Sequence, residues 1–287
     1  MIRARRAGWT IPGVNLGLTA LVVAVSVAVS IGGFLLLRRH APAGGFFSDG
    51  DRASGILGLI STAYAVLLGF VVFLAFTSYD TARSGARSEA TDLIQQFETA
   101  QLMPKSAAPA LSGELVCYGR AVVGIEWPLL RRGAAASFNP WGLALFETLK
   151  TVEPRTASEQ AAYSRWLDET AAREEARLDR VQAGSGVIPT PLWIITFLLG
   201  GLVVAYVALF ADPAERVLPQ VLTASVVAAT LATSVMLIRF LDNPYSHGSG
   251  SLQPTDMVRV LGQIDQASRA IGIPVHAPCE ENGRKRA

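Results

Sequence analysis

The side chains that usually carry catalysis are few and scattered in this sequence of 287 residues. The three histidines, His40, His247 and His276, lie in three different segments. No phosphate-binding glycine loop, nucleophile elbow, HExxH or CxxC motif is present. Cys117 and Cys279 are far apart and belong to no paired motif, so we expect neither a disulfide framework nor a metal site. The sequence therefore predicts no enzyme, no metal and no cofactor.

One apolar segment carries a pattern suited to passing a solute rather than to a reaction. At 100° per residue, small and then aromatic residues fall on one stripe, and large aliphatic residues fall broadly opposite. The stripe consists of Gly55, Gly58, Thr62, Ala65, Gly69, Phe73 and Phe76. Because small residues let membrane helices approach closely, one interpretation is a packing seam within a subunit. The other is a pore lining formed by Gly58, Thr62, Ala65, Gly69, Phe73 and Phe76, with the two rings as a constriction.

Four apolar segments are long enough to carry such a stripe across a membrane. The chain is 51% hydrophobic and only 17% charged, with a mean hydropathy of +0.36. The uncharged segments run from Val14 to Leu37, from Ala53 to Tyr79, from Pro191 to Ala211 and from Val217 to Ile238. Each reaches the length of about 20 residues that crosses a bilayer. We expect the first to be retained rather than cleaved as a signal peptide, because basic residues follow it instead of a small-residue cleavage site.

The segment 80–188, between the second and third apolar segments, has a helical pattern. The second helix should continue out of the membrane and be followed by an amphipathic segment that ends at Trp127–Pro128. A short helix is expected from Pro140, which suits a first turn. Thr156 and Glu159 form a capping-box pattern before a long charged helix.

The fold class is predicted to be all-α, because no alternating strand pattern of any length occurs. We expect an integral membrane protein with four transmembrane helices and a helical insertion. The boundaries are a basic N-terminal tail at 1–13, transmembrane helices 1 and 2 at 14–79, the insertion at 80–188, transmembrane helices 3 and 4 at 189–240, and a C-terminal tail at 241–287. The tail should contain an amphipathic helix from Thr255 to Ile271, and its last fifteen or so residues should be disordered.

Arginine placement predicts the orientation in the membrane. With four crossings, both termini and the insertion share one side, whose flanks hold Arg3, Arg5, Arg6, Arg83, Arg87, Arg177, Arg180 and Arg239. The short loops of the opposite side hold Arg38, Arg39, Arg52 and Arg216. Because basic residues favour the cytoplasmic side, the termini and the insertion are predicted to be cytoplasmic, in a protein of the plasma membrane. Basic ends of this kind mark that side or lipid head groups, so no nucleic-acid partner is expected.

Some polar residues near the fourth segment are expected in ordinary structural roles. Thr223, Thr230 and Ser234 should bond to their own helix or to a neighbouring one. Asp242 should either cap the turn that follows or pair with Arg239.

Three stretches together resemble a known family. The first is Gly58–Phe70 with the exit of its helix, the second is Tyr118–Val123 leading to Glu126, Trp127 and Pro128, and the third is Leu241–Tyr245. The motif positions within the last two are Tyr118, Glu126, Trp127, Pro128, Asp242 and Pro244. In these stretches the chain resembles the bestrophin-like proteins of the DUF4239 family. It departs from the family pattern at Asn243, where a basic residue is usual, and at Tyr245, where phenylalanine is usual.

The resemblance implies a function as well as a fold. Bestrophins are anion channels with four helices per subunit that form pentamers around a pore lined by the second helix. By analogy we expect a homo-oligomer in the lipid bilayer, a pentamer, that forms an anion (chloride) channel lined by the second helix. The acidic cluster that binds calcium in animal bestrophins is not found, so calcium gating is not expected. The alternative is a non-conducting membrane scaffold or sensor whose helical cytoplasmic domain binds a partner.

Overall fold

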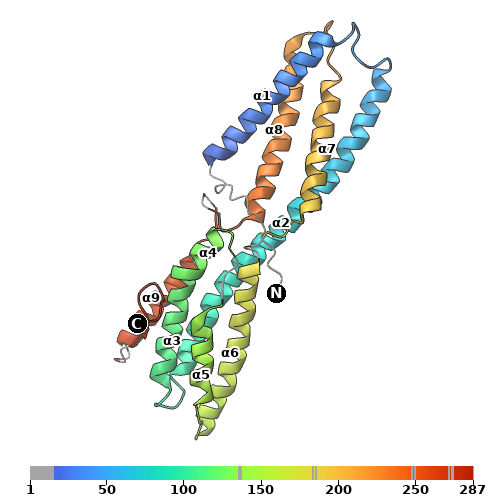
Figure 1. The fold of residues 1–287 in the computed structure, drawn as a ribbon. Helices are drawn as coiled ribbons and strands as arrows, with labels where there is room; N and C mark the ends of the chain where they lie inside the picture. Colours follow the sequence, from blue (N-terminus) through green and yellow to red (C-terminus); the bar gives the residue numbers. More distant parts are fainter. Residues whose placement is uncertain are drawn as a thin grey trace, which may run out of the picture.

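A computed structural model describes residues 16–134, 138–182, 184, 186–246, 248, 250–270, 272 and 275–286. The predicted basic tail at 1–13, with Arg3, Arg5 and Arg6, lies outside these residues, as does His247. Over the described part the chain is helical, with no β-strand beyond one isolated bridge, which confirms the all-α prediction (Figure 1).

Within the described ranges, four helices are long and apolar enough to cross a membrane. They are α1 (Leu16–His40), the first half of α2 (Gly50–Ala100), α7 (Thr190–Ala208) and α8 (Val217–Asp242). Large aliphatic residues such as Leu59, Leu198 and Leu218 stand about 70% exposed on their outer surfaces. Without hydrocarbon around it such a surface would be costly, so these helices form a membrane bundle and the four predicted crossings are confirmed.

Helix α2 is the element that joins the two halves of the molecule. It has 51 residues and begins at Asp49, whose carboxylate accepts the backbone N–H of Arg52 at 3.0 Å. Its sequence contains no proline, so nothing interrupts the backbone hydrogen bonds over a length of about 75 Å. The helix therefore leaves the membrane bundle and continues into the helical domain, as predicted (Figure 1).

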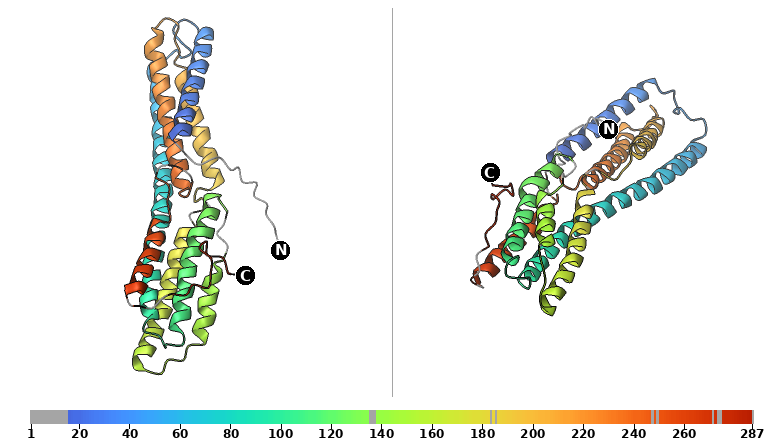
Figure 2. Two further views of the ribbon diagram at one scale, coloured as in Figure 1. Left: turned by 90° about the vertical axis from the view of Figure 1, so that its left-hand side faces the viewer. Right: turned by 60° about the horizontal axis from the view of Figure 1, so that its bottom comes forward.

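The helical domain surrounds the second half of α2. Its other members are α3 (Ala108–Ala121), the π-helix η1 (Val122–Glu126), α4 (Trp127–Arg131), α5 (Pro140–Lys150), α6 (Ala157–Gln182) and α9 (Thr255–Ala270). The capping box before α6 is confirmed: Thr156 Oγ1 accepts the Glu159 N–H at 3.1 Å, and Glu159 Oε2 accepts the Thr156 N–H at 3.0 Å. Figure 2 shows this domain at one end of the membrane helices from two further directions.

The expected end of a helix at Trp127–Pro128 is wrong. Helix α3 runs through η1 directly into α4, which ends at Arg131. In a regular α-helix the Pro128 ring would clash with the carbonyl of Gly124. The wider π-turn of η1, which contains Gly124, precedes the proline and gives that carbonyl room, so the chain continues as a helix.

The predicted disorder of the last residues is also wrong. Residues 275–286 form a turn closed by the bridge between Cys279 and Lys285, with Gly283 in the left-handed region at φ 81°. We call residues 275–286 the C-terminal hairpin. It packs against α3 and η1, and Cys279 is completely buried there.

Cys117 and Cys279 form a disulfide, which the sequence interpretation excluded. Their Cα atoms are 5.7 Å apart although 162 positions separate them along the chain. Helix α9 packs against α2 and α3 and returns the chain to the helix that holds Cys117. Tertiary packing therefore decides the pairing, and the spacing in sequence carried no signal of it.

Candidate functional site

The candidate pore-lining residues lie on a face of α2 that the described part of the chain leaves uncovered. Gly58, Thr62, Ala65 and Gly69 are exposed, and Phe73 and Phe76 are 61% and 54% exposed. A Cβ added at Gly58 or Gly69 would meet no atom within 4 Å. The opposite face of α2, with Tyr64, Val71 and Ala75, is buried against α7 and α8. Among the described residues, no other helix of the subunit packs against this stripe at Gly58 or Gly69.

The same face continues out of the membrane as a charged surface. Asp80, Arg83, Ser84 and Arg87 follow Phe76 at helical spacing, and all are exposed. One acidic and two basic side chains leave this stretch with a net positive charge. Extending the helical periodicity beyond the apolar segment would have found them, because the helix itself continues without a break.

Several threonine and serine hydroxyls of the membrane helices bond to the backbone of their own helix. Thr62 Oγ1 donates to Gly58 O at 2.8 Å. In α8 the hydroxyls of Thr223, Thr230 and Ser234 donate to the carbonyls of the preceding turn at 3.0, 2.9 and 2.9 Å. The expected bonding of these hydroxyls to their own helix is confirmed, although Thr223 and Thr230 are exposed rather than packed against a neighbour.

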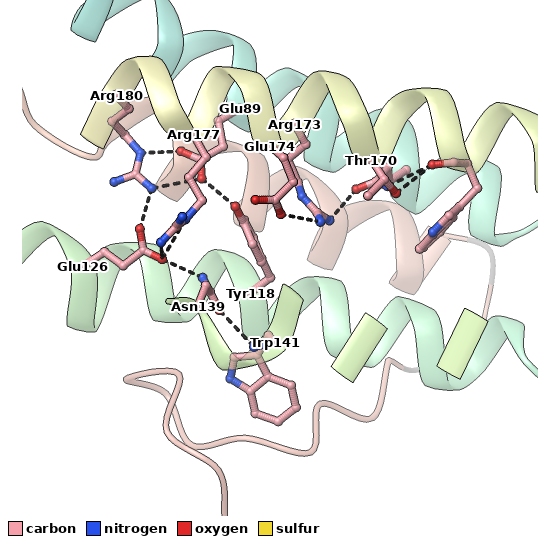
Figure 3. Close-up of polar contacts among 12 residues, drawn as sticks. Glu89, Tyr118, Glu126, Asn139, Trp141, Thr170, Arg173, Glu174, Arg177 and Arg180 are labelled. Carbon is pink, nitrogen blue, oxygen red and sulfur yellow. Dashed lines mark hydrogen bonds and ion pairs between the residues drawn. The ribbon is translucent and has the colours of Figure 1, made fainter. Parts of the chain in front are cut away.

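A second set of polar residues is buried inside the helical domain, where it joins α2, η1 and α6 (Figure 3). Arg180 of α6 binds Glu89 of α2 through Nε and through Nη2, the latter at 3.0 Å, and its Nη2 also donates to Glu126 Oε2 at 2.7 Å. Arg177 Nε lies 3.4 Å from Glu126 Oε1. The side chains of Arg180 and Glu89 are completely shielded from solvent. We call Glu89, Glu126, Arg177 and Arg180 the buried ionic network.

Neutral donors complete the coordination of the two carboxylates. The Tyr118 hydroxyl donates to Glu89 Oε1 at 2.8 Å, and Asn139 Nδ2 donates to Glu126 Oε1 at 2.9 Å. Asn139 also caps α5, because its Oδ1 accepts the Trp141 N–H at 3.1 Å. The positive charges of the two arginines equal the negative charges of the two glutamates. Buried charges that are paired and hydrogen-bonded in this way are tolerated inside a protein.

The surroundings shift the pKa values of Tyr118 and Arg180. Burial, together with the charge of Glu89, raises the pKa of the Tyr118 hydroxyl well above its ordinary value, so it remains a neutral donor. Burial alone would lower the pKa of the Arg180 guanidinium, but Glu89 and Glu126 outweigh it and raise that pKa. Tyr118 as a neutral donor and Arg180 as a cation therefore join α2, η1 and α6 through buried hydrogen bonds and ion pairs.

The remaining motif residues lie where the helical domain meets the membrane bundle. Trp127 Nε1 donates to Leu252 O at 3.2 Å, and its ring meets Tyr245 edge to face at 5.4 Å between centroids. The Tyr245 hydroxyl donates to Arg180 O at 2.5 Å. Pro244 O accepts the Leu252 N–H at 2.8 Å, and Pro128 lies in the first turn of α4.

The expected role of Asp242 is wrong. Its Oδ1 accepts the backbone N–H groups of Val187 and Ile188 at 2.8 and 3.1 Å instead of capping the next turn or pairing with Arg239. Asp242 therefore ties the end of α8 to the chain that leads into α7. These partners are more than fifty positions away in sequence, so no local pattern could reveal them.

Sequence reasoning identified Glu126 and Tyr118 but missed the network they belong to. It treated Arg177 and Arg180 as charges flanking the membrane, whereas Arg180 is completely buried. A signal was available, because Trp166, Arg173, Ala176 and Arg180 recur at helical spacing on one face of α6. With Arg177 and Arg180 inside the domain, the arginine bias behind the predicted orientation is smaller. Among the described residues, no three His, Cys, Asp or Glu side chains form a group that could hold a metal.

Comparisons with known proteins identify the family. Two solved structures of a bacterial bestrophin homolog from Klebsiella pneumoniae have TM-scores of 0.65 and 0.64 to this chain, each at 13% identity. They cover 88% and 91% of this chain and 99% and 100% of theirs. No curated protein matches this chain. A family model described as the Bestrophin-like domain matches residues 23–257. Because this match spans most of the sequence, the chain belongs to the Bestrophin-like domain family.

Proposed function

We propose that this protein forms an oligomeric, anion-permeable membrane channel, with chloride as its main ion and α2 lining the pore. The observation that carries the proposal is the uncovered stripe on α2, from Gly58 to Phe76. A membrane helix usually buries its small residues against a neighbour, since close packing is what they permit. Here the subunit supplies no neighbour for them among its described residues.

Copies arranged around a closed symmetry axis would bring the same α2 face together from every subunit. The glycine, threonine and alanine part of the stripe would then line a wider passage. The rings of Phe73 and Phe76 would surround the axis and form a hydrophobic constriction that opens or closes by wetting. Five copies follow from the analogy with bestrophins.

The charges beyond the constriction favour anions. Arg83 and Arg87 lie on the continuation of the stripe and outnumber Asp80 on that surface. Repeated around an axis, they would make a positive ring at the mouth of the pore and raise the local concentration of anions. We further propose that this mouth, the helical domain and the C-terminal hairpin lie in the cytoplasm and that the channel lies in the plasma membrane.

The test is chloride efflux from liposomes that contain the purified protein. Phe73→Ala and Phe76→Ala should each change the rate of efflux several-fold, because they widen the constriction. The control is Phe197→Ala, a similarly exposed ring on α7, away from the α2 stripe, that should leave efflux near that of the unmodified protein.

Two outcomes would contradict the proposal. Efflux that responds equally to all three substitutions would indicate a general packing defect rather than a pore at α2. No efflux from folded protein in any lipid mixture would favour the scaffold or sensor, with the helical domain as its working part.

A further inference from the structure

The C-terminal hairpin covers α3 and η1 at very short range. A Cβ at Gly113 of α3 would lie 2.4 Å from His276 O, and one at Gly124 of η1 would lie 2.6 Å from Asn282 O. Both distances are shorter than any real contact, so only glycine allows the hairpin backbone to lie directly on these helices. The fit requires the hairpin to be held in one position.

Noncovalent contacts and one covalent bond hold the hairpin there. Trp141 Nε1 of α5 donates to Gly283 O at 2.7 Å. Lys285 Nζ lies 5.6 Å from the centroid of the Trp141 ring. The covalent bond is the disulfide from Cys279 to Cys117 of α3, and both cysteines are completely buried.

A continuous series of hydrogen bonds leads from the hairpin to α2. Trp141, which binds Gly283 O, donates its backbone N–H to Asn139 Oδ1, and Asn139 donates to Glu126 at 2.9 Å (Figure 3). Glu126 accepts from Arg180 at 2.7 Å, and Arg180 binds Glu89 in α2. The position of the hairpin is thus physically linked to the helix that carries the proposed pore face.

We propose that the Cys117–Cys279 disulfide is a reversible, redox-responsive bond that holds the C-terminal hairpin in place. Small cytoplasmic thiols of the glutathione class reduce it, and their disulfides re-oxidise it. Disulfides are rare in the cytoplasm, and those that occur there are usually transient or redox-sensing. The inference therefore rests on the cytoplasmic placement made under the proposed function. The reduced protein releases the hairpin from α3 and η1.

Full reduction of the disulfide consumes two small-molecule thiols. Both sulfurs are buried, so a brief local opening around Cys279 must first expose the S–S bond. A thiolate then attacks Cys117 Sγ, the S–S bond breaks, and its electron pair leaves on Cys279 Sγ. The Arg120 guanidinium, 3.9 Å from Cys279 Sγ, stabilises the departing thiolate. A second thiol then attacks the mixed disulfide, which yields two protonated cysteines and one small-molecule disulfide. Two electrons pass from the two thiols to the protein.

The test uses the full chain in detergent, equilibrated with reduced and oxidised glutathione at a series of ratios. Alkylation of free thiols followed by mass measurement gives the fraction reduced, and hydrogen exchange reports on residues 275–286 and on η1. We expect a reversible transition in folded protein, with amide exchange in the hairpin faster by about ten-fold or more after reduction.

Two variants keep the result interpretable. Cys279→Ser should show the fast exchange of the reduced protein at every glutathione ratio. Trp141→Phe removes the bond to Gly283 O and should speed hairpin exchange in both redox states while the disulfide still forms. A disulfide that yields only on global unfolding, or a hairpin that exchanges at the same rate after reduction, would overturn the proposal.

Failure of the redox proposal can be distinguished from failure of the proposed channel. The alkylation and exchange measurements need no conductance, so they hold even if liposomes show no efflux. Orientation is tested in intact cells with a cysteine-free protein carrying Lys105→Cys, an exposed position of the helical domain. Labelling of the cysteine at position 105 by a membrane-impermeant maleimide added outside the cell would place the helical domain on the extracytoplasmic side. The disulfide would then be a permanent structural bond, which would contradict the redox role.

Discussion

At the scale of single residues, Arg180 shows how much depends on one buried side chain. It neutralises Glu89 and Glu126 together, it is fully shielded from solvent, and its carbonyl accepts the Tyr245 hydroxyl. Desolvating a charge is costly, and the cost is offset only while every partner is present. Three helices converge on this one guanidinium, so its loss should be felt by the whole helical domain.

Replacing Arg180 tests this dependence. Arg180→Met leaves two buried carboxylates with Arg177 alone and should destabilise the domain by about 3–5 kcal/mol. The control is Arg269→Met, which removes an exposed arginine that pairs with the exposed Asp265 and should leave stability almost unchanged. Thermal unfolding of the two variants in detergent measures the difference. Equal melting temperatures would mean that the network does not hold the domain together.

The burial of Glu114 predicts that the stability of the helical domain depends on pH. Burial, only partly offset by its bond from Thr148 and by Lys285, raises the pKa of its carboxyl above the ordinary 4.5. A raised pKa in the folded state means that the charged form is disfavoured there, so Glu114 lowers stability at pH values above its folded pKa. Glu114→Gln should therefore raise the melting temperature at pH 7, and the gain should fade as the pH falls through the raised folded pKa and be absent below the ordinary value of 4.5. A gain independent of pH would contradict this sign.

At the scale of elements, α2 uses glycine in two opposite ways. A Cβ at Gly85 would lie 2.7 Å from Ala176 O of α6, so this glycine permits the close approach of two helices. At Gly69 nothing lies within 4 Å of the same position, so no contact in the subunit requires glycine there. One residue type therefore serves packing in the helical domain and an open surface in the membrane.

This contrast yields a paired prediction. Gly85→Ala should separate α2 from α6 and lower the melting temperature of the domain by several degrees, because the clash is with backbone. Gly69→Ala should leave the melting temperature unchanged or raise it slightly, since alanine favours a helix by up to about 1 kcal/mol. If α2 lines a pore, Gly69→Ala should still alter chloride efflux. A folding defect at Gly69 equal to that at Gly85 would show that the stripe is covered after all.

At the scale of the whole molecule, the chain leaves one surface of α2 open among its described residues. Its uncovered α2 face runs from the membrane to the helical domain and changes from small to aromatic to charged residues. Closed assembly would cover this face in every copy at once. A native mass corresponding to monomers only, in detergent and in lipid, would contradict the assembly and with it the pore.

The charged part of that face sets the expected selectivity. Reversing both Arg83 and Arg87 to glutamate should lower the permeability of chloride relative to potassium, and the loss should shrink at high salt, where charges are screened. Arg259→Glu, an exposed change on α9, is the control. Reversal potentials in planar bilayers measure the effect. Unchanged selectivity in the double variant would remove the two arginines from the ion path.

The parts of this protein that could be read from its sequence are those with a local physical cause. Apolar length specifies the membrane helices, a capping box starts α6 at Thr156 and Glu159, and helical periodicity selects the α2 stripe. The Gly58 to Phe76 stripe could be found, and the motif positions Tyr118, Glu126 and Trp127 were recognised. Each of these depends on neighbours within a few turns of the chain.

What only the tertiary structure decided concerns partners that are distant in sequence. Arg177 and Arg180 resemble flanking charges until α6 places them against Glu89 and Glu126, and Cys117 gains its partner only when the chain returns past α9. Asp242 likewise binds backbone groups that no local rule connects to it. Burial and pairing are properties of the packed chain, because the energy of a charge or a thiol depends on what surrounds it rather than on what precedes it.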